Sequence, residues 1–283
     1  METHEALHIM KVLALTTFHQ EGLELYGQRF IDTFAQNVDK QIDLIVYTEN
    51  CTPTNPQPER IQIVDAKAVL PKLNAFKEKW KDEPKANGIC PPDIKARRPK
   101  DWHKKFKWDA IRFANKVYAV YDACKQTQYD LVIWIDGDTV CHSPSTQDKL
   151  VSFFPEQNWL AYLGRGKKWP ECGFYALYIK QQGAIDFLKE FERVYEDADN
   201  GIFKMEEWHD SYVFDEVLKK IRLQHPNITD LSGHLVKGEG HPLINTELGA
   251  YFDHLKGARK QVGKSKLQDL FRKRHEEYWK DAR

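Results

Sequence analysis

Two carboxylates, Asp136 and Asp138, stand one residue apart directly after an apolar run at positions 131–135. A short run rich in Val, Ile and Trp is typical of a strand that is buried on both faces of a sheet. Gly137, between the carboxylates, permits a tight turn and the close approach of a ligand. Carboxylate oxygens are the usual ligands of hard divalent cations, and open α/β sheets bind ligands at the carboxyl ends of their strands. We therefore expect a metal site here, with an ordinary exposed turn as the alternative.

The residues before this run alternate between strand and helix patterns. Short apolar runs predict strands, and apolar residues at a 3.6-residue period predict helices. Strands are expected at 8–17, 41–47 and 60–64, and helices at 23–37, 66–80 and 108–125. This alternation indicates the α/β class, with a Rossmann-like, mixed but mostly parallel sheet flanked by helices.

The second half of the chain continues the alternation and then becomes irregular. A short helix is expected within 145–154, strands at 159–163 and 171–179, and helices at 181–197 and 208–221. Residues 164–170 contain two Gly, one Arg and two Lys, which predicts a flexible basic loop. Residues 265–283 are predicted to form one charged amphipathic helix. The simplest division is one domain at 8–260, followed by a C-terminal amphipathic helix within 261–283.

One long segment, residues 81–107, interrupts the alternation. Four Pro and one Gly indicate irregular structure, and long loops of this kind are commonly functional. Its second half is basic and carries Trp102 and Phe106, with Trp108 directly after it. We expect either a solvated charged loop or a lid that closes over an anionic ligand. The same residues, 95–107, would also suit a protein that binds nucleic acid or another polyanion.

The composition limits the class of protein. With 283 residues, 41% hydrophobic and 30% charged, the chain is long enough for one large globular domain. The formal net charge is zero, so any polyanionic partner must be bound by a local patch. Five Cys without CxxC spacing argue against a zinc site or a disulfide framework. Because the sequence shows neither an apolar membrane span nor a signal-peptide core, we expect a cytoplasmic protein.

Several motifs, taken in order, resemble one known family. The first strand ends in Thr16 and Thr17, the buried strand ends in DxD, and an ECGF strand starts at Glu171. Near the C-terminus, residues 254–260 have the form HxxGxxK. This set resembles the nucleotide-sugar glycosyltransferases of the GT-A fold, and HxxGxxK resembles the family 8 retaining enzymes, the glycogenin and galactosyltransferase group. Gln261 and Val262 stand where that family has Pro-Trp.

The resemblance implies a glycosyltransferase that moves a hexosyl or pentosyl group from a nucleotide-diphosphate sugar, expected to be a UDP-sugar. The acceptor is open: a glycan, a protein, a small molecule or a nucleic acid. A divalent cation, Mn²⁺ or Mg²⁺, would be held by Asp136, Asp138 and His254, and the imidazole favours Mn²⁺. The donor would be bound by motif residues, namely Thr16, Thr17, Phe18, Asp136, Gly137, Gly257 and Lys260. Glu49, at the end of the second strand, is a further candidate for contacting the nucleoside. Lys260 would also act in catalysis by neutralising the departing phosphate.

Three alternatives remain open at this point. An inverting GT-A enzyme needs a carboxylate base, for which Asp210 is the first candidate and Glu171 the second. Asp210 also lies at the start of a predicted helix, where a carboxylate stabilises the helix end without any catalytic role. A sugar nucleotidyltransferase shares much of the architecture, and a polyanion-binding protein would use residues 95–107.

Overall fold

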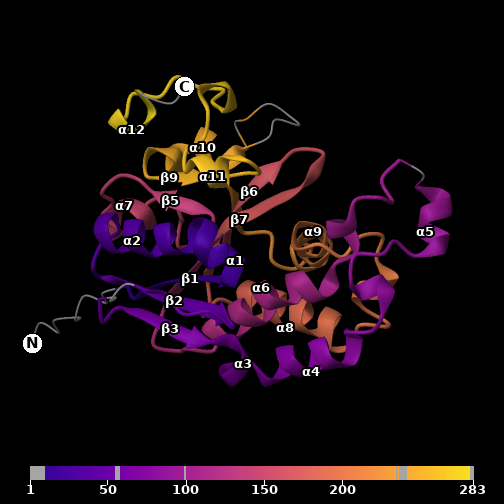
Figure 1. Ribbon diagram of the computed structural model, residues 1–283. Helices are drawn as coiled ribbons and strands as arrows, with labels where there is room; N and C mark the ends of the chain where they lie inside the picture. The colour runs from indigo at the N-terminus through magenta and orange to yellow at the C-terminus, as the bar shows by residue number, and fades with distance from the viewer. Residues whose placement is uncertain (1–9, 55–57, 99, 234, 236–240, 281–283) are drawn as a thin grey trace, which may run out of the picture.

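The computed structural model describes residues 10–54, 58–98, 100–233, 235 and 241–280. A seven-stranded sheet runs in the order β3-β2-β1-β4-β7-β6-β8, and β5 and β9 form a separate two-stranded sheet (Figure 1). The strands are β1 Val12–His19, β2 Ile42–Glu49, β3 Ile61–Asp65, β4 Leu131–Ile135, β5 Thr139–Cys141, β6 Leu160–Arg165, β7 Lys168–Tyr178, β8 Ile228–Asp230 and β9 Phe252–His254. In the large sheet, neighbours are parallel except β7, which pairs antiparallel with both β4 and β6; β5 and β9 pair antiparallel.

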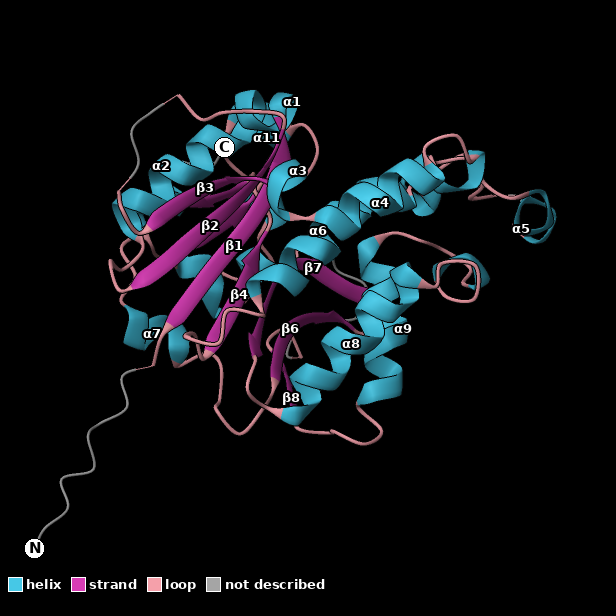
Figure 2. Ribbon diagram, turned by 90° about the horizontal axis from the view of Figure 1, so that it is seen from below, coloured by secondary structure: helices cyan, strands magenta, loops and turns pink. Residues whose placement is uncertain are grey.

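Helices cover both faces of the large sheet (Figures 1 and 2). They are α1 Gln20–Gly22, α2 Gln28–Asn37, α3 Ala66–Val69, α4 Pro71–Trp80, α5 Pro92–Arg97, α6 Ala110–Ala123, α7 Gln147–Val151, α8 Gln182–Glu196, α9 Asp210–Ile221, α10 Pro242–Asn245, α11 Arg259–Val262 and α12 Glu277–Lys280. In β1, Leu13 and Leu15 join the core under α4, α6, α8 and α9, while Val12 and Ala14 join the core under α2 and α7. Successive residues of a strand point to opposite faces of the sheet, and here both sets are buried, so β1 is covered on both faces. The predicted fold class, a mixed and mostly parallel sheet flanked by helices, is confirmed.

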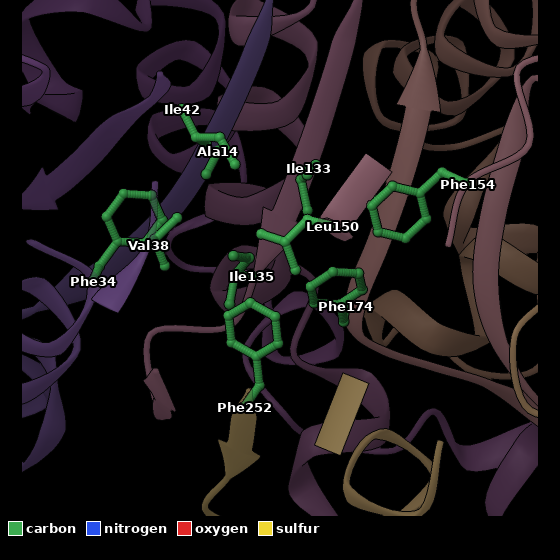
Figure 3. A pocket seen from close by; sticks show the side chains of 10 residues that line it. All are labelled: Ala14, Phe34, Val38, Ile42, Ile133, Ile135, Leu150, Phe154, Phe174 and Phe252. Atoms are coloured by element: carbon green, nitrogen blue, oxygen red, sulfur yellow. The ribbon is translucent and has the colours of Figure 1, made fainter. Parts of the chain in front are cut away.

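The core on the α2 side contains one small void, shown in Figure 3. Apolar side chains line it, among them Ala14, Ile133 and Phe174. Its volume is about 10 Å³, which barely admits one water, and a water also needs polar partners that this lining lacks. The void is therefore a packing gap and not a binding site.

Two predicted segments have a different structure. Residues 164–170 are not a flexible loop: Arg165 pairs with Lys168 across a two-residue turn, and Gly166 takes a φ of +61° there. This tight turn joins β6 to β7. Residues 265–280 are not one helix, because only a 3₁₀ turn at Leu267–Asp269 and the short α12 are helical. The remaining predicted helix positions, 281–283, lie outside the described residues, as do positions 8 and 9 of the first predicted strand.

Contacts to distant residues explain why the C-terminal segment does not form a long helix. The Asp253 carboxylate accepts hydrogen bonds from the Ser265 backbone and hydroxyl, and the Asn245 side chain bonds backbone groups of Asp269 and Phe271. Trp279 is buried, and its Nε1 donates to the Gly249 carbonyl at 2.8 Å. These bonds satisfy backbone groups that a continuous helix would have paired internally. The predicted boundary between a domain and a C-terminal extension stays a prediction.

Residues 81–107 are partly ordered by ion pairs. This segment contains α5, which lies at the edge of the molecule in Figures 1 and 2. Near its end, Lys107 is buried and its Nζ lies 2.8 Å from the Glu207 carboxylate, which is fully buried. Arg98 also pairs with Glu207, Arg97 pairs with Glu206, and Lys104 pairs with Asp101. Much of the positive charge noted in the sequence is therefore neutralised within the protein.

Within the described ranges, the helices all fall short of the length and apolar character that crossing a membrane requires.

Candidate active site

The site lies where β1, β2 and β4 end. These strands are parallel, so their carboxyl ends meet at one edge of the sheet. β4 ends at Ile135, and Asp136 follows at once. A Cβ on Gly137 would lie 2.9 Å from the Phe18 ring, so only glycine fits this close approach to β1 without a shift. The sequence therefore places the carboxylates at the sheet edge, with a glycine required between them.

The small β5–β9 sheet brings His254 to the carboxylates. β5 begins at Thr139, directly after Asp138, and Thr139 pairs with His254. The Leu255 amide also donates to the Asp138 carbonyl at 2.8 Å. As a result, His254 Nε2 lies 3.1 Å from Asp138 Oδ1 and 3.6 Å from Asp136 Oδ2. All three ligand atoms lie within 4.8 Å of one another.

Gly173 of the ECGF strand provides the space for this imidazole. A Cβ on Gly173 would lie 2.5 Å from His254 Cε1 and 3.3 Å from Asp136 Oδ2. Any larger residue would push the histidine away from the carboxylates. The Gly173 carbonyl also accepts the Asp136 amide at 2.8 Å, which fixes the start of the loop. The ECGF motif thus shapes the candidate metal site without contributing a ligand.

The donor set fits a divalent cation. Two carboxylates and one imidazole suit Mn²⁺ or Mg²⁺ and would leave further coordination positions open. A six-coordinate ion with bonds of about 2.1 Å holds neighbouring ligand atoms about 3 Å apart, close to the separations from His254. The other oxygen of Asp136, Oδ1, accepts hydrogen bonds from Trp134 Nε1 at 2.7 Å and from Lys116 Nζ at 3.2 Å. Such outer partners orient a ligating carboxylate.

The charges of the three groups are interdependent. Burial would raise the pKa of Asp138, but His254 and Lys260 outweigh burial and hold that pKa well below its usual value. Burial would lower the pKa of His254, but the Asp138 and Glu171 carboxylates outweigh it and raise that pKa. Burial dominates for Asp136 and raises its pKa, although Lys116 opposes the shift. The ammonium groups that pair with these carboxylates are those of Lys116, at Asp136, and Lys260, at Asp138.

Lys116 is a site residue that the sequence analysis missed. It lies on α6 and is only 7% exposed. Its Nζ lies 2.8 Å from Asp210 Oδ2, pairs with Asp136 and also donates to the Cys172 carbonyl. One feature of the sequence could have pointed to Lys116. The apolar run at 117–120 directly after it indicates a helix that is buried on more than one side. A lysine in such a helix requires a buried carboxylate partner.

Asp210 lies at the first position of α9, as the sequence predicted, and it also faces the site. Its carboxylate accepts the Ser211 amide at 2.8 Å and pairs with Lys116. Burial would raise the pKa of Asp210, but Lys116 outweighs burial and lowers that pKa. Lys116 therefore joins Asp210 to Asp136 and fixes the distance between the two carboxylates.

A cleft of about 630 Å³ opens beside the carboxylates. Six of the predicted donor-binding residues line it: Thr17, Phe18, Glu49, Asp136, Gly137 and Lys260. Lys260 Nζ lies 2.7 Å from Asp138 Oδ2 and 4.9 Å from the centre of the Tyr26 ring. Tyr26 and Arg112 also line the cleft and were not predicted.

Four predicted site residues do not line this cleft. His254 is one of them, because it is buried behind the two carboxylates. Thr16 is fully buried, and its Oγ1 has no hydrogen-bond partner in the described part of the chain. Gly257 has a φ of +59° in the turn that precedes α11, which explains the glycine there. Glu171 pairs with Lys256 and with Arg165, and Lys256 lowers the pKa of Glu171 to about 2 against the effect of burial.

Comparisons with known proteins are limited to folds. No family model matches the sequence, and no curated protein matches it. Three similar solved structures are the WbbM bifunctional glycosyltransferase in its apo form (14% identity, TM-score 0.45), mouse xyloside xylosyltransferase 1 in its apo form (9%, 0.42) and the glycosyltransferase GlyE of Streptococcus pneumoniae (9%, 0.39). The matches cover 80%, 78% and 79% of this chain, and 40%, 85% and 45% of those chains, respectively. This chain thus spans less than half the length of WbbM and of GlyE, and likeness at such TM-scores carries no inference about activity.

Proposed function

We propose that this protein is a metal-dependent glycosyltransferase whose donor is a nucleoside-diphosphate sugar, with UDP as the expected nucleotide. The observation that carries the proposal is the convergence of Asp136, Asp138 and His254 beside a cleft lined by the ends of β1, β2 and β4. Two of these residues follow one strand, and the third comes from the far end of the chain. His254 is buried and the two carboxylates are largely covered, and this convergence has no evident structural purpose, because polar groups are costly to remove from water together.

The residues around the cleft fit the parts of such a donor. A cation held by the three ligands would supply positive charge to the diphosphate as the sugar leaves. Lys260, beside Asp138, would neutralise the phosphate oxygens from the other side. Thr17, Phe18 and Glu49, at the ends of β1 and β2, would contact the nucleoside.

A thermal-shift measurement tests this proposal directly. UDP, GDP and ADP would each be added with Mn²⁺ or with EDTA, because a ligand that binds only the folded state raises the melting temperature. We expect the largest increase with UDP and Mn²⁺ together. An increase with UDP that EDTA leaves unchanged would contradict the metal-dependent site.

We expect the transfer to proceed with retention. The acceptor hydroxyl would attack the anomeric carbon from the face that the diphosphate leaves, the bond to the phosphate oxygen would break, and that oxygen would take the acceptor proton. No side-chain base is then needed, and Asp210, already paired with Lys116, would position the substrate. An inverting enzyme would instead use Asp210 as its base.

The stereochemistry of the first-formed product separates the two mechanisms. With a UDP-α-sugar donor, proton NMR should show an α linkage, and Lys260→Ala should lose most of the rate, roughly 10²-fold or more, as expected for loss of one charge-stabilising group. Asp210→Asn should then act mainly on substrate positioning. A β linkage, together with an Asp210→Asn variant that binds donor but does not turn over, would establish inversion.

Whether residues 81–107 act as a lid can be tested by limited proteolysis. If this segment closes over the bound donor, trypsin should cut it at exposed positions such as Lys95 and Lys105, and UDP with Mn²⁺ should slow the cutting. The Asp138→Ala variant serves as the control, since its cleavage should not respond to the ligand. Equal cleavage of the wild type with and without ligand would support the solvated-loop interpretation.

A further inference from the structure

Four aromatic side chains surround His209 next to the cleft. The centroids of the Trp169 and Phe106 rings lie 5.1 Å and 5.5 Å from the imidazole centroid, and those of Phe113 and Tyr212 both lie 6.2 Å away. Trp169 also contacts Tyr212, with a centroid distance of 5.6 Å. The four rings come from different parts of the chain: Phe106 precedes α6, Phe113 is on α6, Trp169 is on β7 and Tyr212 is on α9. We call this group the aromatic platform.

The platform is continuous with the candidate active site. Phe113 and Asp210 both line the cleft, and Asp210 follows His209 directly. Through Lys116, Asp210 is joined to the metal-ligand candidate Asp136. The elements that carry the platform pack together, since α9 contacts both β7 and α6 (Figure 2).

The platform is accessible although its centre is buried. His209 is 3% exposed, whereas Phe106 is 43% exposed and the other three rings are half-buried. A cluster that served only as core would be expected to bury its rings, and here the polar imidazole is the group at the centre. Partly exposed rings beside a cleft are typical of small-molecule sites, in which aromatic walls combine with a few placed polar groups.

A buried charge network fixes the platform. His209 Nε2 lies 3.0 Å from Glu207, and His209 Nδ1 accepts the Tyr212 amide. Glu207 is fully buried and also pairs with Lys107, whose Nζ lies 5.4 Å from the centre of the Trp169 ring. A preorganised surface loses less conformational entropy when a ligand binds.

We propose that the aromatic platform binds the acceptor, and that the acceptor is a saccharide. This inference rests on the proposed transferase function and adds the class of acceptor. One face of a pyranose ring carries C–H groups that pack on aromatic rings, while its hydroxyls remain available to polar groups such as Asp210. A sugar on the platform would lie beside Asp210 with a hydroxyl toward the diphosphate site. A nucleobase could also stack on such rings, and the experiment below separates the two ligands.

Saturation-transfer NMR on the full chain tests the inference. The probes are millimolar methyl β-glucopyranoside, methyl β-galactopyranoside, methyl α-mannopyranoside and methyl N-acetyl-β-glucosaminide, each with UDP and Mn²⁺ present. We expect transfer to the ring protons of at least one probe, and an affinity about tenfold weaker in Trp169→Ala, from loss of the stacking contact. Phe106→Ala removes the most exposed ring and should weaken binding in the same direction without endangering the fold.

Trp102→Ala is the matched control. Trp102 is 42% exposed and its ring packs against Lys95 and His103. Among the described residues, its ring makes no contact with His209 or the four platform rings, so its loss should leave glycoside binding unchanged. Three outcomes would each overturn the inference. The first is no signal from any glycoside, the second is equal signals in wild type and Trp169→Ala, and the third is equal losses in Trp169→Ala and Trp102→Ala. Loss of UDP binding in Trp169→Ala would also overturn it, by showing that the platform binds the nucleobase. Failure of the transferase proposal appears separately, as a wild-type protein whose melting temperature does not respond to UDP and Mn²⁺.

Discussion

Replacing Asp138 with alanine should abolish the Mn²⁺-dependent binding of UDP while the protein remains folded. Asp138 offers one carboxylate oxygen to the candidate ion and contacts both His254 and Lys260. Removing a partner that only supports a metal ligand typically costs 10- to 100-fold in affinity, so loss of a ligand should exceed about 100-fold. Isothermal titration calorimetry with UDP at fixed Mn²⁺ measures this effect. Asp136→Ala should behave in the same way.

Asp148→Asn is the matched control for this experiment. Asp148 is an exposed carboxylate on α7, and its removal should change neither UDP affinity nor the metal requirement. Wild-type affinity for UDP in Asp138→Ala, still dependent on Mn²⁺, would show that the ion is held elsewhere.

The structure also changes the expected stability of the Asp138→Ala variant. Repulsion between the two carboxylates, considered from the sequence alone, suggests that removing one would stabilise the ion-free protein. In the structure, however, Asp138 pairs with the Lys260 ammonium group and lies 3.1 Å from the His254 imidazole. Its removal leaves these groups without their anion, so we expect a modest loss of stability in the absence of metal.

Replacing Lys116 with methionine should have the largest effect on stability. Methionine preserves most of the side-chain volume but removes the charge that faces Asp136 and Asp210. Because two half-buried carboxylates then lose their shared cation, the free energy of unfolding should fall by about 3 kcal/mol, the lower end of the cost of removing one partner of a buried ion pair. Urea unfolding, followed by circular dichroism, measures the change.

Added Mn²⁺ provides a sharper readout of the Lys116→Met variant. An ion bound beside Asp136 restores positive charge, so Mn²⁺ should stabilise the variant more than it stabilises the wild type. Lys125→Met is the control, because Lys125 is exposed just after α6 and its replacement should change stability by less than about 0.5 kcal/mol. Equal stabilities of wild type and Lys116→Met would mean that the buried ion pairs do not form as described.

The sequence by itself determined the fold class and the position of the carboxylates. Buried strands, amphipathic helices and the Gly between Asp136 and Asp138 are local patterns. Such patterns predict structure correctly when the apolar face that they define is the face that packs in the core. The order of these patterns was sufficient to predict a mostly parallel sheet with a ligand site at the end of β4. The sequence also linked His254 and Lys260 to that site, through resemblance and not through any local signal.

Only the tertiary structure decided how the distant residues meet. The short β5 and β9 strands were not predicted, since three-residue strands carry almost no periodic signal, yet their pairing places His254 beside Asp138. The partners of Lys116 come from the end of β4 and the start of α9, far away in the sequence. The predicted C-terminal helix failed for a related reason: Asp253 and Asn245 bind backbone groups of residues 265–271, so tertiary hydrogen bonds override the local helical pattern. Periodicity records which side of an element is apolar, whereas the buried polar contacts that build this site depend on which elements pack together.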